Sequence, residues 1–293
     1  MSRSPDRRAP LSLSACTTWH QPFAEDLGCY RDAGIEGIGL WEFKLPRGRD
    51  DESVELLRES GLRATFCFPE VPSIVPGDTL FSQPRDRVER LRRLCDGIRR
   101  LARFDPLRVI CYAGPPGDNA RQMRAWVVEM MREASAAAGE SGVRLAIEVL
   151  RPSRNGSLVS TVAQALELIN DAGAQNIDVL IDTWHFWDAP GALDDIARHA
   201  ERIVGVQLAD RRSGARGMMD RTLPGWGDVD MGAIVRALRA TSFDGWYEIE
   251  IFSDDGTFGS DYPDSLWKME PARLVSEARR SFDELWAAAE VNA

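Results

Sequence analysis

The sequence predicts an α/β protein folded as a single (β/α)8 barrel, and three observations lead to this prediction. Eight short apolar runs alternate with eight longer amphipathic segments. The 293 residues suit this fold, which needs about 250 residues for one domain. The segment CTTWHQPF after the first apolar run lacks the glycine fingerprint of a doubly wound nucleotide-binding sheet. No linker or change of composition divides the chain. We therefore predict one TIM barrel over residues 11–293, after a mobile N-terminal arm, residues 1–10.

The eight apolar runs are rich in β-branched or aromatic residues, as buried parallel strands are. They span Leu11–Ala15, Ile35–Leu40, Leu62–Phe68, Leu107–Tyr112, Val143–Val149, Ile177–Asp182, Ile203–Leu208 and Trp246–Phe252. Segments between them carry apolar residues at helical spacing, clearest in Pro84–Arg103, Ala125–Gly139, Thr161–Ala172, Met231–Thr241 and Pro271–Ala289. Strands that alternate strictly with helices predict a parallel sheet.

Composition and charge argue against several classes of protein. The chain has 46 acidic and 36 basic residues, a formal charge of −10, whereas nucleic-acid binding needs a basic face. No run of about 18 apolar residues predicts a membrane span. The N-terminus, MSRSPDRRAP, lacks the apolar core of a secretory signal. The five cysteines show no metal-binding spacing and fit reduced thiols. We expect a cytoplasmic protein without nucleic-acid or membrane partners.

Polar residues end four consecutive predicted strands, where barrel enzymes carry their active sites. They are Glu148 in AIEVL, Asp182 in VLIDTW, Gln207 in GVQLAD and Glu250 in EIEIF. A carboxylate in such apolar surroundings costs several kcal/mol unless it is paired or binds a metal. Crowded carboxylates also repel one another unless a cation lies among them. The sequence therefore predicts one divalent ion, Mn²⁺, Mg²⁺ or Co²⁺, held by these oxygen ligands. For each residue alone, the alternative is a buried salt bridge to arginine.

Glu248 raises a question of assignment, because it lies two residues before Glu250 and faces the same side of the strand. We prefer Glu250 as the ligand because it is nearer the functional end. Glu248 would then lie one layer deeper in the barrel. Arg144 shares the inward parity of Glu148, and we expect it to neutralise Glu248. Finding Arg144 outside the barrel would remove that pairing.

Two histidines are candidates for the site. His185 follows Asp182 by three residues, where an imidazole can act as a general base or hold substrate. Its alternative is packing among the neighbouring aromatic rings. His20 ends the first strand after Trp19 and has either a substrate contact or a loop-packing role. His199, within a helix, is expected at the surface.

Aromatic and basic side chains gather near the predicted rim. Trp19, Trp41 and Trp184 are expected to stack on sugar or aromatic faces of a substrate, or else to pack within loops, as are Trp187 and Trp226. Six loop arginines provide either an anion pocket or solvated charge: Arg151, Arg154, Arg211, Arg212, Arg216 and Arg221. The long segment 253–270 is expected to be a lid, a binding element or an interface.

Five of these motifs together resemble one family. They are LAIEVL with Glu148, IDTWH with Asp182 and His185, VQLAD with Gln207 and Asp210, LPGWGDVD, and FDGWYEIEIF with Glu250. Over nearly its whole length the chain resembles the xylose-isomerase-like sugar phosphate isomerase/epimerase superfamily, which includes inosose dehydratase and 3-dehydroshikimate dehydratase relatives. The resemblance implies four metal ligands: Glu148, Asp182, Gln207 and Glu250. It also implies an arginine downstream of the strand-seven ligand, Arg211 or, as we prefer, Arg212.

One position departs from the superfamily pattern. Most of its isomerases and epimerases carry His where this chain has Gln207, whereas the dehydroshikimate dehydratase branch uses Gln there. The resemblance implies a metal-dependent sugar isomerase or epimerase that removes a proton next to a carbonyl. Glu148, Glu250 and His185 are its candidate catalytic residues. Its substrate would be a sugar-like or cyclic polyol or keto compound.

Two other functions stay open. One is a metal-dependent lyase, similar either to the two dehydratases or to a C-glycoside-cleaving subunit. The other is a non-catalytic sugar-binding barrel. The chain could assemble with copies of itself or with a different partner chain.

Overall fold

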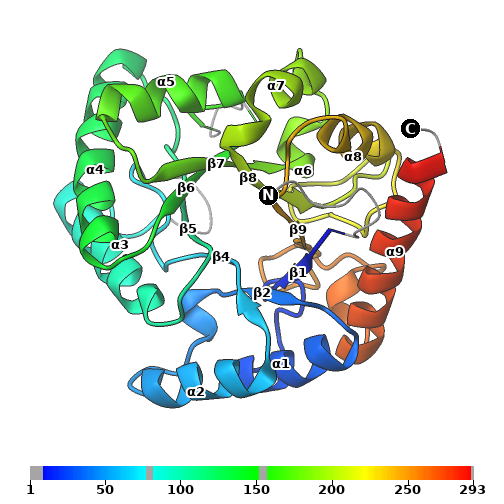
Figure 1. Cartoon of the computed structure of the whole chain (residues 1–293). Helices are drawn as coiled ribbons and strands as arrows, with labels where there is room; N and C mark the ends of the chain where they lie inside the picture. Colours follow the sequence, from blue (N-terminus) through cyan, green and yellow to red (C-terminus); the bar gives the residue numbers. More distant parts are fainter. Residues whose placement is uncertain (1–8, 77–81, 152–156, 292–293) are drawn as a thin grey trace.

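The protein is a parallel barrel surrounded by helices (Figure 1). The computed structural model describes residues 9–76, 82–151 and 157–291. Its sheet has the order β3-β2-β1-β9-β8-β7-β6-β5-β4, so the first and last long strands are neighbours. β1 pairs in parallel with β2 on one side and with β9 on the other, and β9 pairs in parallel with β8. The predicted (β/α)8 barrel is confirmed.

The strands lie close to the predicted apolar runs. They are β1 Leu11–Ser14, β2 Gly37–Gly39, β3 Arg63–Ala64, β4 Phe66–Cys67, β5 Arg108–Cys111, β6 Leu145–Val149, β7 Ile177–Asp182, β8 Ile203–Leu208 and β9 Trp246–Ile249. The longer helices are α1 Phe23–Asp32, α2 Asp50–Ser60, α3 Arg87–Ala102, α4 Ala120–Glu140, α5 Val162–Ala172, α7 Ala192–His199, α8 Met231–Arg239 and α9 Pro271–Val291. Short turns complete the pattern: α6 Thr183–Phe186, η1 Glu42–Lys44, η2 Ala200–Arg202 and η3 Leu266–Lys268.

The third predicted strand is divided into two. β3 pairs with β2, and β4 pairs with β5, while Thr65 separates the two halves. The two edges of the sheet are therefore consecutive pieces of one segment, and together they occupy one of the eight strand positions. At this break, the Thr65 hydroxyl donates a hydrogen bond to Glu248 Oε2 at 2.9 Å. We call this junction between β3 and β4 the seam of the barrel.

Local sequence signals explain where helices begin and end. Asp86, Asn119, Thr161 and Asp230 each accept a hydrogen bond from a backbone N–H in the first turn of the helix that follows. The Asn119 cap lets α4 begin five residues before the predicted Ala125. Gly61 ends α2 with a φ of 75°, a left-handed conformation that costs glycine little.

Side chains fill the interior of the barrel. The Phe66 ring lies so close to Gly205 of β8 that a Cβ at this glycine would overlap it. Gly39 of β2 leaves room in the same way for the carboxylate of Glu248. The layer below the strand ends is thus closely packed.

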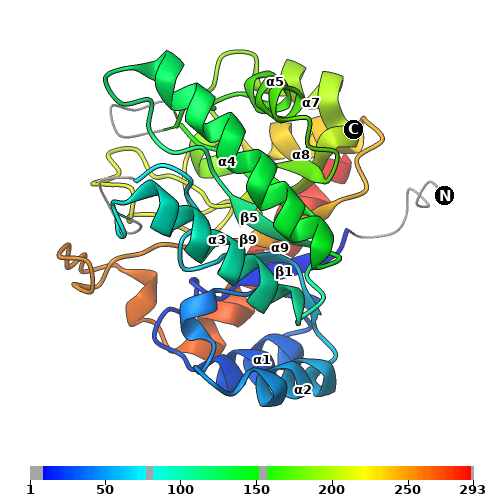
Figure 2. The ribbon, with the colours of Figure 1, turned by 90° about the vertical axis from the view of Figure 1, so that its left-hand side faces the viewer.

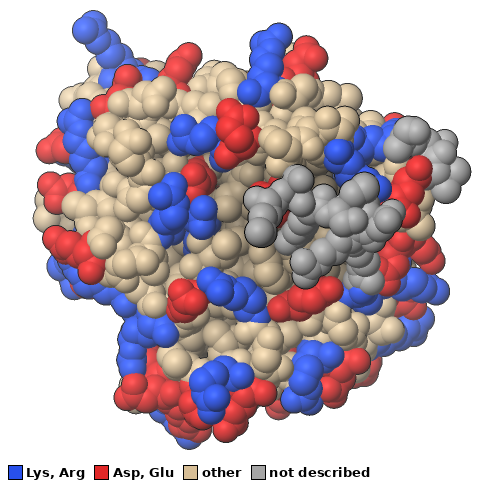
Figure 3. All heavy atoms as spheres, viewed as in Figure 1, with Lys and Arg blue, Asp and Glu red and all other residues tan. Residues whose placement is uncertain are grey.

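The surface carries charges of both signs, and the start of the described chain is held against the sheet. On the face shown in Figure 3, basic and acidic side chains are interspersed. Residues 1–8 of the predicted arm lie outside the described part of the chain. The Pro10 carbonyl already accepts a hydrogen bond from Tyr247 N at 3.1 Å, so the chain is held against β9 one residue before β1. Within the described ranges, no helix has both the length and the apolar composition needed to cross a membrane.

Candidate active site

The four predicted strand-end residues lie on adjacent strands of the barrel. Glu148 belongs to β6, Asp182 ends β7, Gln207 belongs to β8, and Glu250 directly follows β9. All four side chains are buried. The register pairs Asp182 with Gln207 and Gln207 with Glu248, which lies two residues before Glu250. Inward parity on parallel strands therefore places these polar groups together at the carboxyl end.

Three ligand groups lie especially close together. One atom each from Glu148, Asp182 and His185 lies within 4.8 Å of the others. His185 reaches this position because α6 begins immediately after Asp182, whose carboxylate accepts the backbone N–H of Trp184 at 2.9 Å. The imidazole Nε2 is 3.8 Å from Asp182 Oδ2. The predicted placement of His185 beside a strand-end carboxylate agrees with this geometry.

Arg221 connects the remaining carboxylate to this group. Its side chain is 5% exposed, and Nη1 donates to Asp182 Oδ2 at 2.9 Å and to Glu250 Oε2 at 3.1 Å. Nη2 is 3.5 Å from His185 Nε2. The sequence placed Arg221 only among six loop arginines. Its one distinguishing signal was its position two residues before LPGWGDVD.

Gln207 has an unusual set of contacts. Its Nε2 donates to Glu248 Oε1 and to Glu250 Oε1, both at 3.0 Å. Its Oε1 is buried and has no hydrogen-bond partner among the described residues. A buried acceptor without a partner is costly, so this oxygen is suited to a ligand that the structure does not contain.

Burial and mutual repulsion perturb the acids of the cluster. Burial, then Glu250 and Asp182, raise the pKa of Glu148 well above its usual range. Burial raises the pKa of Glu250 to about 8, with Asp182 adding to the rise and Arg221 opposing it. Burial lowers the pKa of His185 well below its ordinary value, and Arg221 lowers it further. Negative charge is therefore in excess around a neutral imidazole.

The residues present fit a divalent cation. Glu148, Asp182 and Glu250 offer three carboxylates, whereas Arg221 brings one positive charge to two of them. Burial and the neighbouring acids raise the pKa values of Glu148 and Glu250, and Gln207 Oε1 is an uncommitted oxygen. Carboxylate and amide oxygens are ligands that Mg²⁺ and Mn²⁺ prefer.

The expected pairing of Glu248 with Arg144 is wrong. Arg144 directly precedes β6, which begins at Leu145, and so lies at the opposite end of this strand from Glu148. Its guanidinium instead contacts Asp178 at 3.0 Å, with its side chain 44% exposed. Glu248 instead accepts hydrogen bonds from uncharged donors, the amide of Gln207 and the hydroxyl groups of Ser12 and Thr65.

The predicted tryptophans fall into two places. Among the described residues, Trp19 and Trp41 belong to a cluster of seven aromatic rings, the others being Phe43, Phe68, Phe252, Phe258 and Trp267. Phe252 joins this aromatic cluster to the acids, because its ring lies 4.9 Å from the Arg221 guanidinium. The ring of Trp184 also lies close to Arg221, 5.5 Å from its guanidinium.

Two predicted substrate-binding residues lie apart from the acids. His20 is 53% exposed and contacts Asp255 at 2.8 Å, in the long segment after β9. Arg212 is 38% exposed and pairs with Asp264 at 2.6 Å. Arg154 lies outside the described residues. His199 is partly exposed, at the end of α7.

Two buried aspartates fix the loops at this end of the barrel. Asp210 accepts backbone N–H groups from Arg211, Gly225, Gly227 and Val229, which fixes the loop after Arg221. Asp254 similarly accepts three backbone N–H groups, those of Gly256, Phe258 and Ser260. The segment that Asp254 holds extends from one end of the molecule, in orange in Figure 2.

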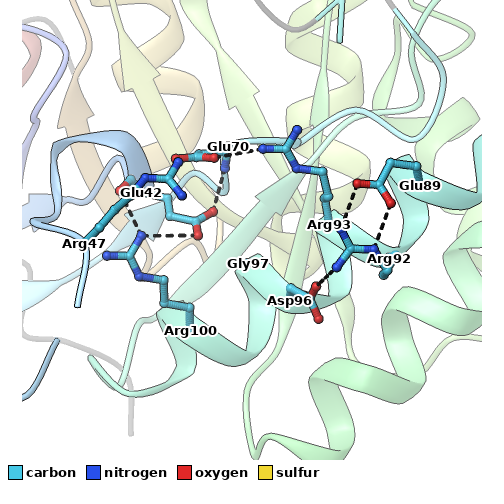
Figure 4. A pocket seen from close by; sticks show the side chains of 9 residues that line it. All are labelled: Glu42, Arg47, Glu70, Glu89, Arg92, Arg93, Asp96, Gly97 and Arg100. Carbon is cyan, nitrogen blue, oxygen red and sulfur yellow. Dashed lines mark hydrogen bonds and ion pairs between the residues drawn. The ribbon is translucent and has the colours of Figure 1, made fainter. Parts of the chain in front are cut away.

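A charged hollow of about 390 Å³ lies outside this site, beside η1 and α3 (Figure 4). Its arginines are paired with acids: Arg47 and Arg93 with Glu70, Arg92 with Glu89 and Asp96, and Arg100 with Glu42. Because the opposite charges balance, this hollow has no excess of positive charge for an anion. None of the predicted site residues lines it.

A family model matches residues 30–285, described as the xylose isomerase-like TIM barrel. The chain belongs to this family. Its four strand-end residues thus lie on a family barrel, as the sequence motifs indicated.

Curated relatives include isomerases, epimerases and dehydratases. D-psicose 3-epimerase of Enterocloster bolteae is 28% identical over 55% of this chain and 49% of its own length. Hydroxypyruvate isomerase of Escherichia coli is 26% identical over 74% of this chain and 83% of its own. 3-Dehydroshikimate dehydratase of Pseudomonas putida is 29% identical over 44% of this chain and 21% of its own. The chain thus spans about half or less of the epimerase and the dehydratase.

A solved structure of the same fold carries a metal. The IOLI protein with a bound zinc atom superposes with a TM-score of 0.77 at 18% identity, over 96% of this chain and 99% of that one. At this identity the likeness shows the fold alone.

Proposed function

We propose that this protein is a divalent-metal-dependent sugar isomerase or epimerase that removes a proton next to a carbonyl. The observation that carries the proposal is the convergence of Glu148, Asp182 and His185 within 4.8 Å, with Arg221 joining Glu250 to them. The isomerases and epimerases among the curated relatives support it. The substrate class is a sugar-like or cyclic polyol or keto compound.

Glu148, Asp182, Gln207 and Glu250 would hold the metal, as their oxygen chemistry suits Mn²⁺ or Mg²⁺. Such an ion, when bound, supplies Lewis acidity that polarises a substrate carbonyl and acidifies the neighbouring C–H. Neutral residues would not supply this charge. Side chains of the protein then take the proton from the substrate and return it.

The acids and the imidazole have separate tasks in this proposal. Glu148 and Glu250 are the candidate bases that take the proton from the carbon, because their carboxylates lie at the carboxyl end of the barrel, beside the proposed ion. Returning that proton to the opposite face of the same carbon gives the epimer, and returning it to the former carbonyl carbon gives the isomer. His185 is neutral, so it can accept a hydroxyl proton from the substrate and return it to the former carbonyl oxygen, which becomes the hydroxyl group of the isomer. Arg221 holds an oxygen that gains negative charge.

The aromatic cluster would bind the apolar face of the substrate. Phe252 lies between Arg221 and the rings of Trp19 and Trp41, at 6.3 and 5.6 Å from them. Aromatic faces stack on the C–H faces of sugars. A substrate held by the acids would therefore extend toward this cluster.

Proton exchange in heavy water tests the proposal. The Mn²⁺-loaded protein is incubated in D₂O with a panel of keto-sugars and cyclitols, and deuterium next to the carbonyl is measured by NMR. We expect incorporation by the wild type and at least a 100-fold loss, about what general-base removal costs, in Glu148→Gln or Glu250→Gln. Glu42→Gln, which alters a carboxylate of the charged hollow, is the matched control. Metal content by mass spectrometry, with and without Mn²⁺ loading, completes the test. A wild type that binds no ion after loading would refute the proposal.

A lyase is the second candidate, and Gln207 favours it. Gln at this place resembles the dehydroshikimate dehydratase branch, and a dehydratase is among the relatives. The same proton removal followed by loss of a β-hydroxyl as water gives an unsaturated product. Ultraviolet absorbance of a new conjugated carbonyl, in the same incubations, separates this outcome from isomerisation.

A further inference from the structure

Glu248 is a buried acid that the proposed reaction does not use. It lies on β9, one layer below Glu250. Its Oε2 accepts hydroxyl hydrogen bonds from Ser12 and Thr65, both at 2.9 Å. Gly39 leaves space for it, since a Cβ there would lie 2.5 Å from Oε2. Contacts from β1, β2 and the seam thus fix this carboxylate in one place.

The remaining oxygen of Glu248 determines how Gln207 is oriented. Gln207 Nε2 lies 3.0 Å from Glu248 Oε1 and 3.0 Å from Glu250 Oε1. A primary amide has a donor end and an acceptor end, whereas an ionised carboxylate only accepts. The flipped amide would place its oxygen against two carboxylate oxygens. Both N–H bonds are therefore committed, and Oε1 is turned away from both acids.

Glu248 differs from Glu250 in its freedom to move. Glu250 is one of the expected ligands, so its oxygens would be drawn to an ion. Glu248 is held by the hydroxyl groups of Ser12 and Thr65. It is the acceptor that stays in place when an ion enters.

We propose that Glu248 is a positioning residue that presents Gln207 Oε1, and not Nε2, to the metal ion. This inference rests on the proposed function, because it assumes that an ion is bound. Removing a carboxylate that orients a metal ligand in this way commonly weakens metal binding by about 10–100-fold. The free oxygen of Gln207 is the direct structural consequence. Gln207 and Glu248 would thus act as a pair.

Titration of the metal-free protein with Mn²⁺, followed by the EPR signal of the free ion, measures this pair without using activity. We expect Glu248→Gln to bind Mn²⁺ about 10–100-fold more weakly than the wild type. Exchanging the two residues, Gln207→Glu with Glu248→Gln, restores binding because the amide at 248 now donates to the carboxylate at 207. Gln207→Glu alone binds more weakly than the exchanged pair, since the new carboxylate then faces both Glu248 and Glu250, whereas in the exchanged pair it faces Glu250 alone.

Asp26→Asn is the matched control for losing a buried carboxylate. Asp26 lies on α1 and bonds to Thr18 and Lys44, both at 2.6 Å. We expect this variant to bind Mn²⁺ like the wild type. Thr65→Val, which removes one hydrogen bond from Glu248 at nearly constant volume, gives a second test if circular dichroism shows that Glu248→Gln is unfolded. It should also weaken Mn²⁺ binding.

The outcomes separate the two proposals. A wild type that takes up no Mn²⁺ contradicts the proposed function. Equal Mn²⁺ affinities for the wild type and a folded Glu248→Gln, or Thr65→Val in its place, overturn the positioning role and leave the function standing. Tighter binding by Gln207→Glu alone than by the exchanged pair also overturns it, because charge would then explain the affinity.

Discussion

Replacing Arg221 by Met tests whether the acids of the site depend on its charge. The guanidinium is 5% exposed and donates from Nη1 to Asp182 and Glu250, at 2.9 and 3.1 Å. Methionine keeps much of the length and apolar contact of the stem but removes the charge. Because two buried carboxylates lose their shared donor, we expect a loss of about 3–5 kcal/mol in the free energy of unfolding.

Thermal unfolding in a chelator measures this loss. At about 2–4 °C per kcal/mol, the expected fall in Tm is about 6–20 °C. The loss should be greater at high pH than at low pH. Arg221 lowers the pKa values of Asp182 and Glu250, so without it both acids stay protonated over a wider range, and a protonated acid needs no cation. Excess Mn²⁺ should restore much of the stability.

Arg212→Met is the matched control. Arg212 is 38% exposed and pairs with Asp264, and an exposed pair contributes about 0–1 kcal/mol. We expect its Tm to stay within a few degrees of the wild type. If Arg221→Met unfolds within about 1 kcal/mol of the wild type at high pH without metal, Arg221 does not neutralise the cluster.

Three further predictions follow from the same contacts. Burial raises the pKa of Glu250 in the folded protein to about 8, against an ordinary value of 4.5, so the folded protein keeps a proton that the unfolded chain has lost. The Tm of the metal-free protein should therefore fall as the pH rises from about 5 to about 8 and level off above that, and Mn²⁺ should flatten the slope; a Tm that rises over this range contradicts this. Asp210→Asn should cost about 1–3 kcal/mol and speed proteolysis of residues 223–229, since the amide keeps one oxygen and two of the four backbone N–H groups lose their acceptor; unchanged cleavage would count against it. Gly205→Ala should lower the free energy of unfolding in urea by about 1–3 kcal/mol, because the new methyl group overlaps the Phe66 ring, and adding Phe66→Leu should recover part of this loss. An unchanged free energy of unfolding in Gly205→Ala would show that the ring moves aside freely.

The strands could be predicted well where apolar runs are uninterrupted. Ile177–Asp182 and Ile203–Leu208 have the predicted bounds. The run at 62–68 is equally apolar but is divided at Thr65, because the barrel closes there and the hydroxyl turns to Glu248. The partner of this hydroxyl, Glu248, lies far along the chain, so a local pattern does not contain it.

The strand-end acids could be predicted from position, but their partners could not. A buried acid requires compensation, and the sequence offers many arginines of similar standing. Arg144 had the right parity yet precedes its strand and pairs with Asp178. Arg221 reaches the acids from a loop whose path depends on Asp210. Such a partner becomes visible only when the loop's own hydrogen bonds are known.

The way Asp254 holds its loop has a consequence for how the rim of this barrel can vary. The loop's shape depends on three main-chain N–H groups that donate hydrogen bonds to one buried carboxylate. Main-chain groups are the same for nearly every residue type, so side chains such as Thr257 and Phe258 can be exchanged while the path of the loop persists. Selection for a new substrate can thus alter the chemistry of the rim without first finding a new way to fold it.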